Sequence, residues 1–171
     1  MDRMSSIELA IKNEKTEMQY YMNESRRSNN PLARAMFKEL AKDEQEHMRR
    51  IRGLHGKLVA EGAWPTDVRI EVAGTDITRV LDELVGLESS AAGHDHDDIV
   101  ALEKAAAFES SGATFYAELA AACDNPQEQE FFAFLANIER EHHLSVTDSL
   151  AYLQDPEDWM MQHGRAGLDG A

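Results

Sequence analysis

The chain has 171 residues, of which 43% are hydrophobic and 29% charged, so it can bury a core and is not composed like a disordered protein. Its formal net charge of −15 argues against nucleic acid or an anionic membrane surface as a partner. No apolar run approaches the roughly 20 residues of a membrane-spanning helix, and the N-terminus lacks the apolar part of a secretion signal. We therefore expect one cytoplasmic domain, residues 1–171.

The first two expected helices form a hairpin over about residues 5–62. Ser5 and Glu8 have capping-box spacing, so the first helix should run from about residue 5 to residue 28. Asn30 followed by Pro31 places an N-cap residue before a proline at the first helical position, which predicts a second helix ending near Gly62. The short turn between them makes the pair antiparallel.

A long crossover, about residues 63–97, is expected to follow this hairpin. We expect an extended piece near residues 68–72 and a small helix near residues 75–87. At its end, His94-Asp95-His96-Asp97-Asp98 has the composition of a metal cluster. Acidic residues at the start of a helix are also explained by capping and by the helix dipole. We favour that structural role for the segment.

A second hairpin is expected over about residues 98–154. Its first helix should span residues 98–123, and Asn125-Pro126 should open a last helix that reaches about residue 153. The tail from residue 164 to residue 171 should be frayed. Two helical hairpins joined by a long crossover are the topology of a ferritin-like bundle. The sequence therefore predicts an all-α fold, an antiparallel four-helix bundle.

The two hairpins are copies of one pattern at an offset of 95 residues. Among the coincidences, Asn30-Pro31 falls on Asn125-Pro126, and the polar residues Glu14, Tyr21, Glu44, Glu46 and His47 fall on Glu109, Tyr116, Glu139, Glu141 and His142. Duplicated units of this kind usually mean that one supersecondary element is used twice.

Acidic and basic side chains interrupt the apolar stripe in the middle of every helix of the repeat. The interrupting residues are Glu14, then Glu44 and His47, then Glu109, then Glu139 and His142. Burying an unpaired carboxylate costs on the order of several kcal/mol or shifts its pKa until it is neutral, so four in one core require cations. One Glu from each of two helices and Glu-x-x-His from the other two is the ligand set of di-iron and di-manganese bundles.

Further residues on the same helix faces indicate a metal site less clearly. Tyr21 and Tyr116 each follow a stripe glutamate by seven residues, and they are expected either to pack in the core or to hydrogen-bond a ligand carboxylate. Glu17 lies one turn from Glu14 and could add a carboxylate, but its repeat counterpart is Gly112, so we favour a surface position. Cys123 is the only cysteine, so a metal site must use oxygen and nitrogen ligands.

These motifs resemble those of the rubrerythrin family within the ferritin-like superfamily. Residues 37–47 are similar to the second-helix motif of that family and residues 132–142 to the fourth, and the likeness covers about two-thirds of the chain. The resemblance implies a two-metal site, iron by default with manganese or zinc as alternatives, in which Glu44 or Glu139 bridges the ions. The implied ligands are Glu14, Glu44, His47, Glu109, Glu139 and His142.

The sequence also departs from the family pattern. No rubredoxin-like domain is recognisable, so an external electron donor is expected. The third helix of rubrerythrins carries a further carboxylate one turn after its ligand glutamate, linked to movement of an iron between redox states, where this chain has Gly112. Glu17 stands at the matching place on the first helix and is a candidate substitute.

The resemblance implies an oxidoreductase of peroxidase or ferroxidase type, active against oxidative stress, in which ferrous iron reacts with hydrogen peroxide or dioxygen. Two alternatives stay open: iron storage or delivery without peroxide turnover, and a di-manganese catalase-like protein. We expect a homo-oligomer and favour a dimer.

Overall fold

The structure is a computed structural model that describes residues 3–62 and 96–164. Its helices are α1 (Arg3–Arg27), α2 (Pro31–Glu61), α4 (His96–Ala122), α5 (Pro126–Gln154) and α6 (Pro156–Gly164), with no strand in these two ranges. The extended piece and small helix expected in the crossover, the residues His94 and Asp95, and the tail from residue 165 lie outside the described residues.

Asparagine and proline start both second helices of the repeat, as predicted. The Asn30 side chain accepts a hydrogen bond from the Ala33 N–H at 3.0 Å. The Asn125 side chain accepts from two backbone N–H groups at 2.9 and 3.1 Å. At its other end α2 stops at Gly62, whose φ of 68° is a left-handed conformation that glycine adopts without steric cost.

Two local features were not predicted from the sequence. Helix α1 already runs from Arg3, so Ser5 lies inside it and is not its cap, because arginine and methionine are good helix formers. Helix α6 was not predicted, since Asp155-Pro156 was taken only as the end of α5. Proline interrupts α5 but suits the first position of a new helix, and the Asp155 side chain accepts a hydrogen bond from the Asp158 N–H at 3.0 Å.

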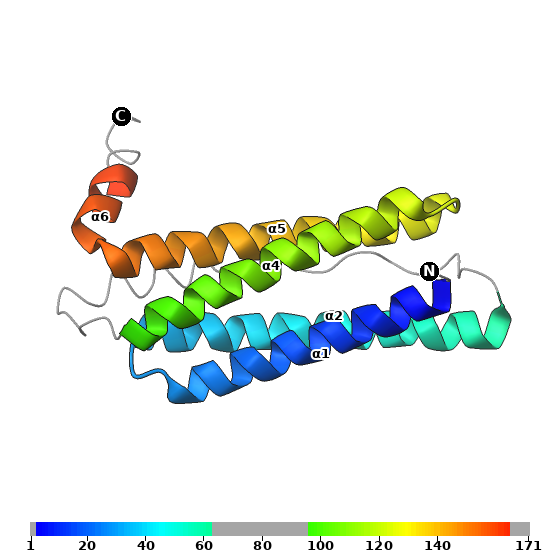
Figure 1. Ribbon diagram of the computed structural model, residues 1–171, viewed down its shortest axis with the longest axis horizontal. Coiled ribbons are helices and arrows are strands. Elements are labelled where there is room, and N and C mark those ends of the chain that lie inside the picture. Colours follow the sequence, from blue (N-terminus) through cyan, green and yellow to red (C-terminus); the bar gives the residue numbers. More distant parts are fainter. Residues whose placement is uncertain (1–2, 63–95, 165–171) are drawn as a thin grey trace.

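The two hairpins pack side by side as an all-α, ferritin-like four-helix bundle (Figure 1). Helix α1 packs along α2 and α4 packs along α5, while α1 meets α4 and α2 meets α5 across the bundle. Helix α6 turns away from the end of α5, where Trp159 packs against Tyr152 with ring centroids 5.3 Å apart. The expected fold class is confirmed.

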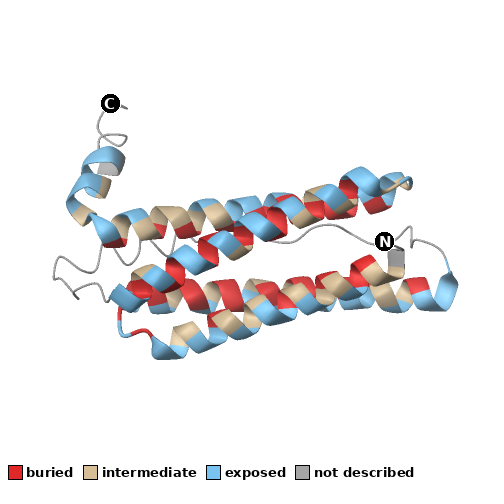
Figure 2. Cartoon of the chain, in the orientation of Figure 1, coloured by how far each residue is buried: buried red, intermediate tan, exposed pale blue. Residues whose placement is uncertain are grey.

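Buried residues lie along the helix faces that meet inside the bundle (Figure 2). Most of the buried hydrophobic residues belong to one of two apolar clusters. One contains Tyr21 and Phe37, stacked with centroids 6.3 Å apart. The other contains their repeat counterparts Tyr116 and Phe132, also stacked at 6.3 Å. The fold therefore has approximate twofold symmetry, and the stretch of interior between the two clusters is where the polar residues lie.

Candidate metal centre

The six residues singled out by the sequence meet in this stretch. None of them exposes more than 3% of its surface, and they come from the middle of all four long helices. They are Glu14 of α1, Glu44 and His47 of α2, Glu109 of α4, and Glu139 and His142 of α5. In each Glu-x-x-His pair the spacing of three places both side chains on one helix face.

These side chains form two overlapping groups whose nitrogen and oxygen atoms could hold a metal ion. The first group, called here the His47 group, is Glu14, Glu44, His47 and Glu139. The second, the His142 group, is Glu44, Glu109, Glu139 and His142. Within each group one atom from every residue lies within 4.8 Å of the others. Both Glu44 and Glu139 belong to both groups, so either carboxylate is placed to bridge two ions.

The two histidines face the carboxylates through the same ring atom. The Nδ1 atom of His47 lies 3.1 Å from Glu14 Oε2 and 3.0 Å from Glu44 Oε2. The Nδ1 atom of His142 lies 3.3 Å from Glu109 Oε2 and 3.5 Å from Glu44 Oε1. The two rings are nearly parallel, with centroids 5.6 Å apart. Each imidazole thus directs one nitrogen into the centre of the cluster.

Each tyrosine hydroxyl bonds a glutamate of the opposite hairpin. The Tyr21 hydroxyl donates to Glu109 Oε1 at 2.5 Å, and the Tyr116 hydroxyl donates to Glu14 Oε1. Of the two roles left open by the sequence, the structure shows both at once, because these rings also belong to the apolar clusters. Each bond occupies one carboxylate oxygen and leaves the second directed at the cluster.

Burial and crowding move the pKa values of the cluster away from their ordinary positions. Burial raises the pKa of Glu14 to about 7, helped by Glu44 and only partly offset by His47. Burial and Glu44 also raise the pKa of Glu139 well above its ordinary value. Burial opposes charge on Glu44 too, but contacts with His47 and His142 lower its pKa overall. Burial opposes protonation of His47, yet Glu44 and Glu14 raise its pKa to about 10.

Several buried atoms at the centre have no hydrogen-bond partner among the described residues. They are Glu44 Oε1, Glu109 Oε2, both carboxylate oxygens of Glu139, and His142 Nδ1. A buried polar atom left without a partner costs about 1–3 kcal/mol, more when charged, so such a collection is strongly unfavourable. Divalent cations bound by oxygen and imidazole ligands would satisfy all of them, so the residues present fit a two-metal centre.

Glu17 is neither on the open surface nor fully enclosed, contrary to the position that we favoured. The side chain is half-buried on α1. Burial, followed by Glu44, Glu14 and Glu109, raises the pKa of its carboxyl to about 10, but Glu17 belongs to neither of the two metal-binding groups. Across the bundle, a Cβ atom placed on Gly112 would lie 3.1 Å from Glu139 Oε2. Glu139 therefore occupies space that a side chain at position 112 would need.

Asp43 contacts the cluster and was missed by the sequence analysis. Its Oδ2 atom lies 3.2 Å from His142 Nε2, on the opposite side of the ring from the cluster. The apolar stripe gave no signal, because Asp43 lies beside that stripe and has Ile138 as its repeat counterpart.

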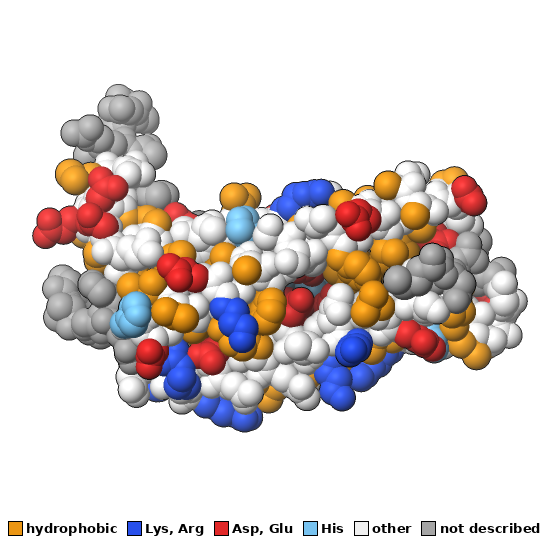
Figure 3. Space-filling model, in the orientation of Figure 1, with side chains coloured by type: hydrophobic (Ala, Val, Ile, Leu, Met, Phe, Trp, Pro, Cys, Tyr) orange, Lys and Arg blue, Asp and Glu red, His pale blue; other side chains and the backbone are white. Residues whose placement is uncertain are grey.

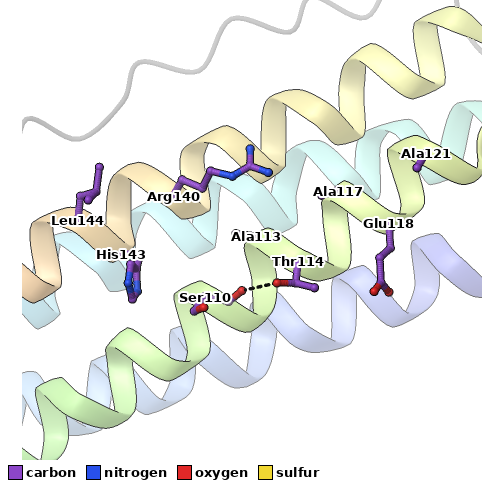
Figure 4. A pocket seen from close by; sticks show the side chains of 9 residues that line it. All are labelled: Ser110, Ala113, Thr114, Ala117, Glu118, Ala121, Arg140, His143 and Leu144. Carbon is purple, nitrogen blue, oxygen red and sulfur yellow. Dashed lines mark hydrogen bonds between the residues drawn. The ribbon is translucent and has the colours of Figure 1, made fainter.

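The surface offers two kinds of concavity. A pocket of about 610 Å³ lies between α4 and α5, lined by alanines with His143, Arg140 and Leu144, and none of the six cluster residues lines it (Figure 4). On the face shown in Figure 3, acidic side-chain atoms are visible inside a hollow between the two hairpins.

The acidic start of α4 has a structural role in the described part of the chain. Asp98 is buried and pairs with Arg27 at 2.8 Å, and that arginine also donates to the Asp97 carbonyl at 3.1 Å. These contacts join the start of α4 to the end of α1. Residues 96–98 are part of no metal-binding group among the described residues.

The fold and the cluster together define a class, a four-helix bundle with a buried carboxylate and histidine centre suited to two metal ions. The rubrerythrin family model matches residues 6–73 and 101–166, more than half of the chain. The chain therefore belongs to the rubrerythrin family, which supports a di-iron protein. Neither curated protein sequences nor solved structures gave a significant match. None of the described helices is long and apolar enough to span a bilayer.

Proposed function

We propose that this protein is a non-haem di-iron oxidoreductase that reduces hydrogen peroxide or dioxygen with electrons from an external donor. The observation that carries the proposal is the pair of overlapping groups that share Glu44 and Glu139 in the middle of the bundle. The shared carboxylates would hold two ions, which together would bind and reduce one small oxygen substrate.

The proposed ligands are the six cluster residues, with Glu17 as an additional carboxylate. Four glutamates carry four negative charges, which two divalent cations neutralise. This balance would offset the cost of burying the four carboxylates, because an unpaired buried charge is strongly destabilising. The bound irons supply the electrons and the binding positions for the oxygen substrate.

The chain itself holds the centre in position. The Tyr21 and Tyr116 hydroxyls hold one oxygen of Glu109 and of Glu14, so each singly contributed glutamate has its second oxygen fixed toward the ions. The two apolar clusters close the interior on both sides and exclude bulk water. We propose that Glu17, which is half-buried on α1 one turn from Glu14, takes up or releases a proton near the substrate.

The partners and location of the protein are also proposals. We propose a cytoplasmic homodimer served by a separate electron-transfer protein. The native mass of the purified protein separates this assembly from the large hollow shell that iron storage needs. A shell-sized oligomer would favour storage over peroxide turnover.

The proposal is tested by rapid mixing of the reduced, iron-loaded protein with peroxide and, separately, with dioxygen. Fast oxidation by peroxide and slow oxidation by dioxygen would support a peroxidase, and the reverse ratio a ferroxidase. The Glu44→Ala variant should react with neither, while Glu141→Ala, a change at an exposed residue of α5, should behave like wild type. A wild-type protein whose iron reacts with neither oxidant would contradict the proposal.

A further inference from the structure

The two histidines of the cluster differ in the group that lies at the ring nitrogen Nε2. Asp43 of α2 lies behind His142, with Oδ2 3.2 Å from Nε2 in an ion-pair contact. Neither atom makes a hydrogen bond with a described residue, so this ion-pair contact is the polar interaction that the structure gives the two atoms. The His142 side chain exposes 3% of its surface and that of Asp43 19%, so the contact is largely shielded from water.

The imidazole ring of His142 has carboxylates at both of its nitrogens. Nδ1 faces Glu109 and Glu44 in the cluster, while Nε2 faces Asp43. A carboxylate at Nε2 keeps the proton on that nitrogen and leaves the lone pair on Nδ1, directed at the ion. Carboxylates placed behind a ligand histidine in this way fix its tautomer and orientation and make it a stronger donor.

His47 has no such support. Its Nδ1 atom faces the cluster as in the other copy, but its Nε2 atom is buried and has no hydrogen-bond partner in the part of the chain that the structure describes. At the position equivalent to Asp43, the repeat has Ile138, which is 5% exposed and has no group that could accept a proton from the ring. The two histidines therefore differ although their spacing and ring planes match.

We propose that Asp43 is a positioning residue for His142, and that it makes the two metal positions unequal, with the ion in the His142 group held more tightly. The inference rests on the proposed two-metal centre. It adds an order of binding: the His142 group fills first and the His47 group second. The His47 group then holds the more easily exchanged ion.

Stepwise titration of the metal-free, full-length chain with Co²⁺, followed by absorption spectroscopy and calorimetry, tests the inference. Wild type should bind two ions in two resolved steps. The His142→Ala variant should lose the tighter step and His47→Ala the weaker one. In Asp43→Asn the tighter step should weaken about 10- to 100-fold, the usual effect of removing such a partner, and its cobalt absorption bands should shift. The weaker step should stay unchanged.

Two controls separate positioning from folding and from bulk charge. Asp43→Asn should melt at the wild-type temperature when metal-free, because the side chain is half-buried and keeps its shape. Glu141→Gln, which removes one negative charge from an exposed position of α5, should leave both binding steps unchanged. A second variant, Ile138→Asp, should tighten the weaker step by providing the missing carboxylate.

The outcomes distinguish the inference from the function on which it rests. Two ions bound with equal affinity, or an Asp43→Asn variant that keeps the tighter step or weakens both steps alike, would overturn the inference and leave the two-metal centre standing. A wild-type chain that binds no Co²⁺ at the cluster would overturn both.

Discussion

The two helical hairpins make a natural experiment, because they carry the same pattern into one shared centre and differ at a few positions beside it. Both contribute a single glutamate, a Glu-x-x-His pair and a tyrosine that bonds the glutamate of the other hairpin. They differ one turn after the single glutamate, where α1 has Glu17 and α4 has Gly112. They differ again beside the paired glutamate, where α2 has Asp43 and α5 has Ile138.

The comparison shows which features are needed to bury the cluster and which only adjust it. The shared residues supply the charge that would balance two cations and the hydrogen bonds that hold the ligand carboxylates. The unshared residues lie at the edge of the cluster, where a carboxylate is not needed for charge balance. Variants at the shared bridging glutamates and at the two tyrosines should therefore have similar effects in the two hairpins, and variants at the unshared positions unequal ones.

The largest expected effect comes from the two shared glutamates. Glu44→Ala and Glu139→Ala should each abolish two-metal binding, because each carboxylate belongs to both groups. Metal analysis of protein made without a chelating tag measures this directly. Retention of two tightly bound ions by either variant would contradict the assignment of Glu44 and Glu139 as shared ligands. Glu141→Ala serves as the matched control.

The next effect tests whether the tyrosines are equivalent. Tyr21→Phe and Tyr116→Phe should each lower the free energy of unfolding by about 1–3 kcal/mol, since each leaves a buried glutamate oxygen without its donor. Chemical denaturation of the metal-loaded protein gives both values. A large loss in one variant and none in the other would show that the hairpins are not equivalent here.

A smaller effect is expected at Gly112. In Gly112→Ala the new Cβ would lie 3.1 Å from Glu139 Oε2, so the carboxylate must shift. Metal affinity should fall by a factor of about five, corresponding to about 1 kcal/mol of overpacking. Gly53→Ala is the matched control: it is also helical and has nothing within 4 Å of the added atom. It should stabilise the protein by up to about 1 kcal/mol without changing metal affinity.

Proton release should be the smallest effect. The pKa of Glu14 is raised to about 7, chiefly by burial, and that of His47 to about 10, where Glu44 and Glu14 outweigh burial. Near pH 7 His47 is protonated and Glu14 is about half protonated, so binding of a cation should release protons and apparent affinity should rise with pH. Calorimetry in two buffers of different ionisation enthalpy measures the number of protons released on metal binding. Glu14→Gln should release fewer protons, and binding without proton release would contradict this account.

The sequence was sufficient for the bundle and for the assembly of the six residues, because the repeat aligns the interrupted stripes and a bundle that buries all four stripes brings these residues together. It named Glu17 as a candidate without predicting its half-burial, and it missed Asp43, whose contact is with the opposite hairpin. Residue spacing shows which side chains share a helix face, but not what a neighbouring helix presents to them. For the same reason α6 was missed, since one Pro156 ends a helix and begins another.

The most direct test of the two-metal centre is anomalous X-ray scattering from crystals of the iron-loaded protein, recorded on both sides of the iron absorption edge. Two iron peaks per chain should lie within the carboxylate cluster, one beside His47 Nδ1 and one beside His142 Nδ1, with Glu44 and Glu139 in contact with both. Glutamates turned toward solvent, or an interior without iron, would contradict the account.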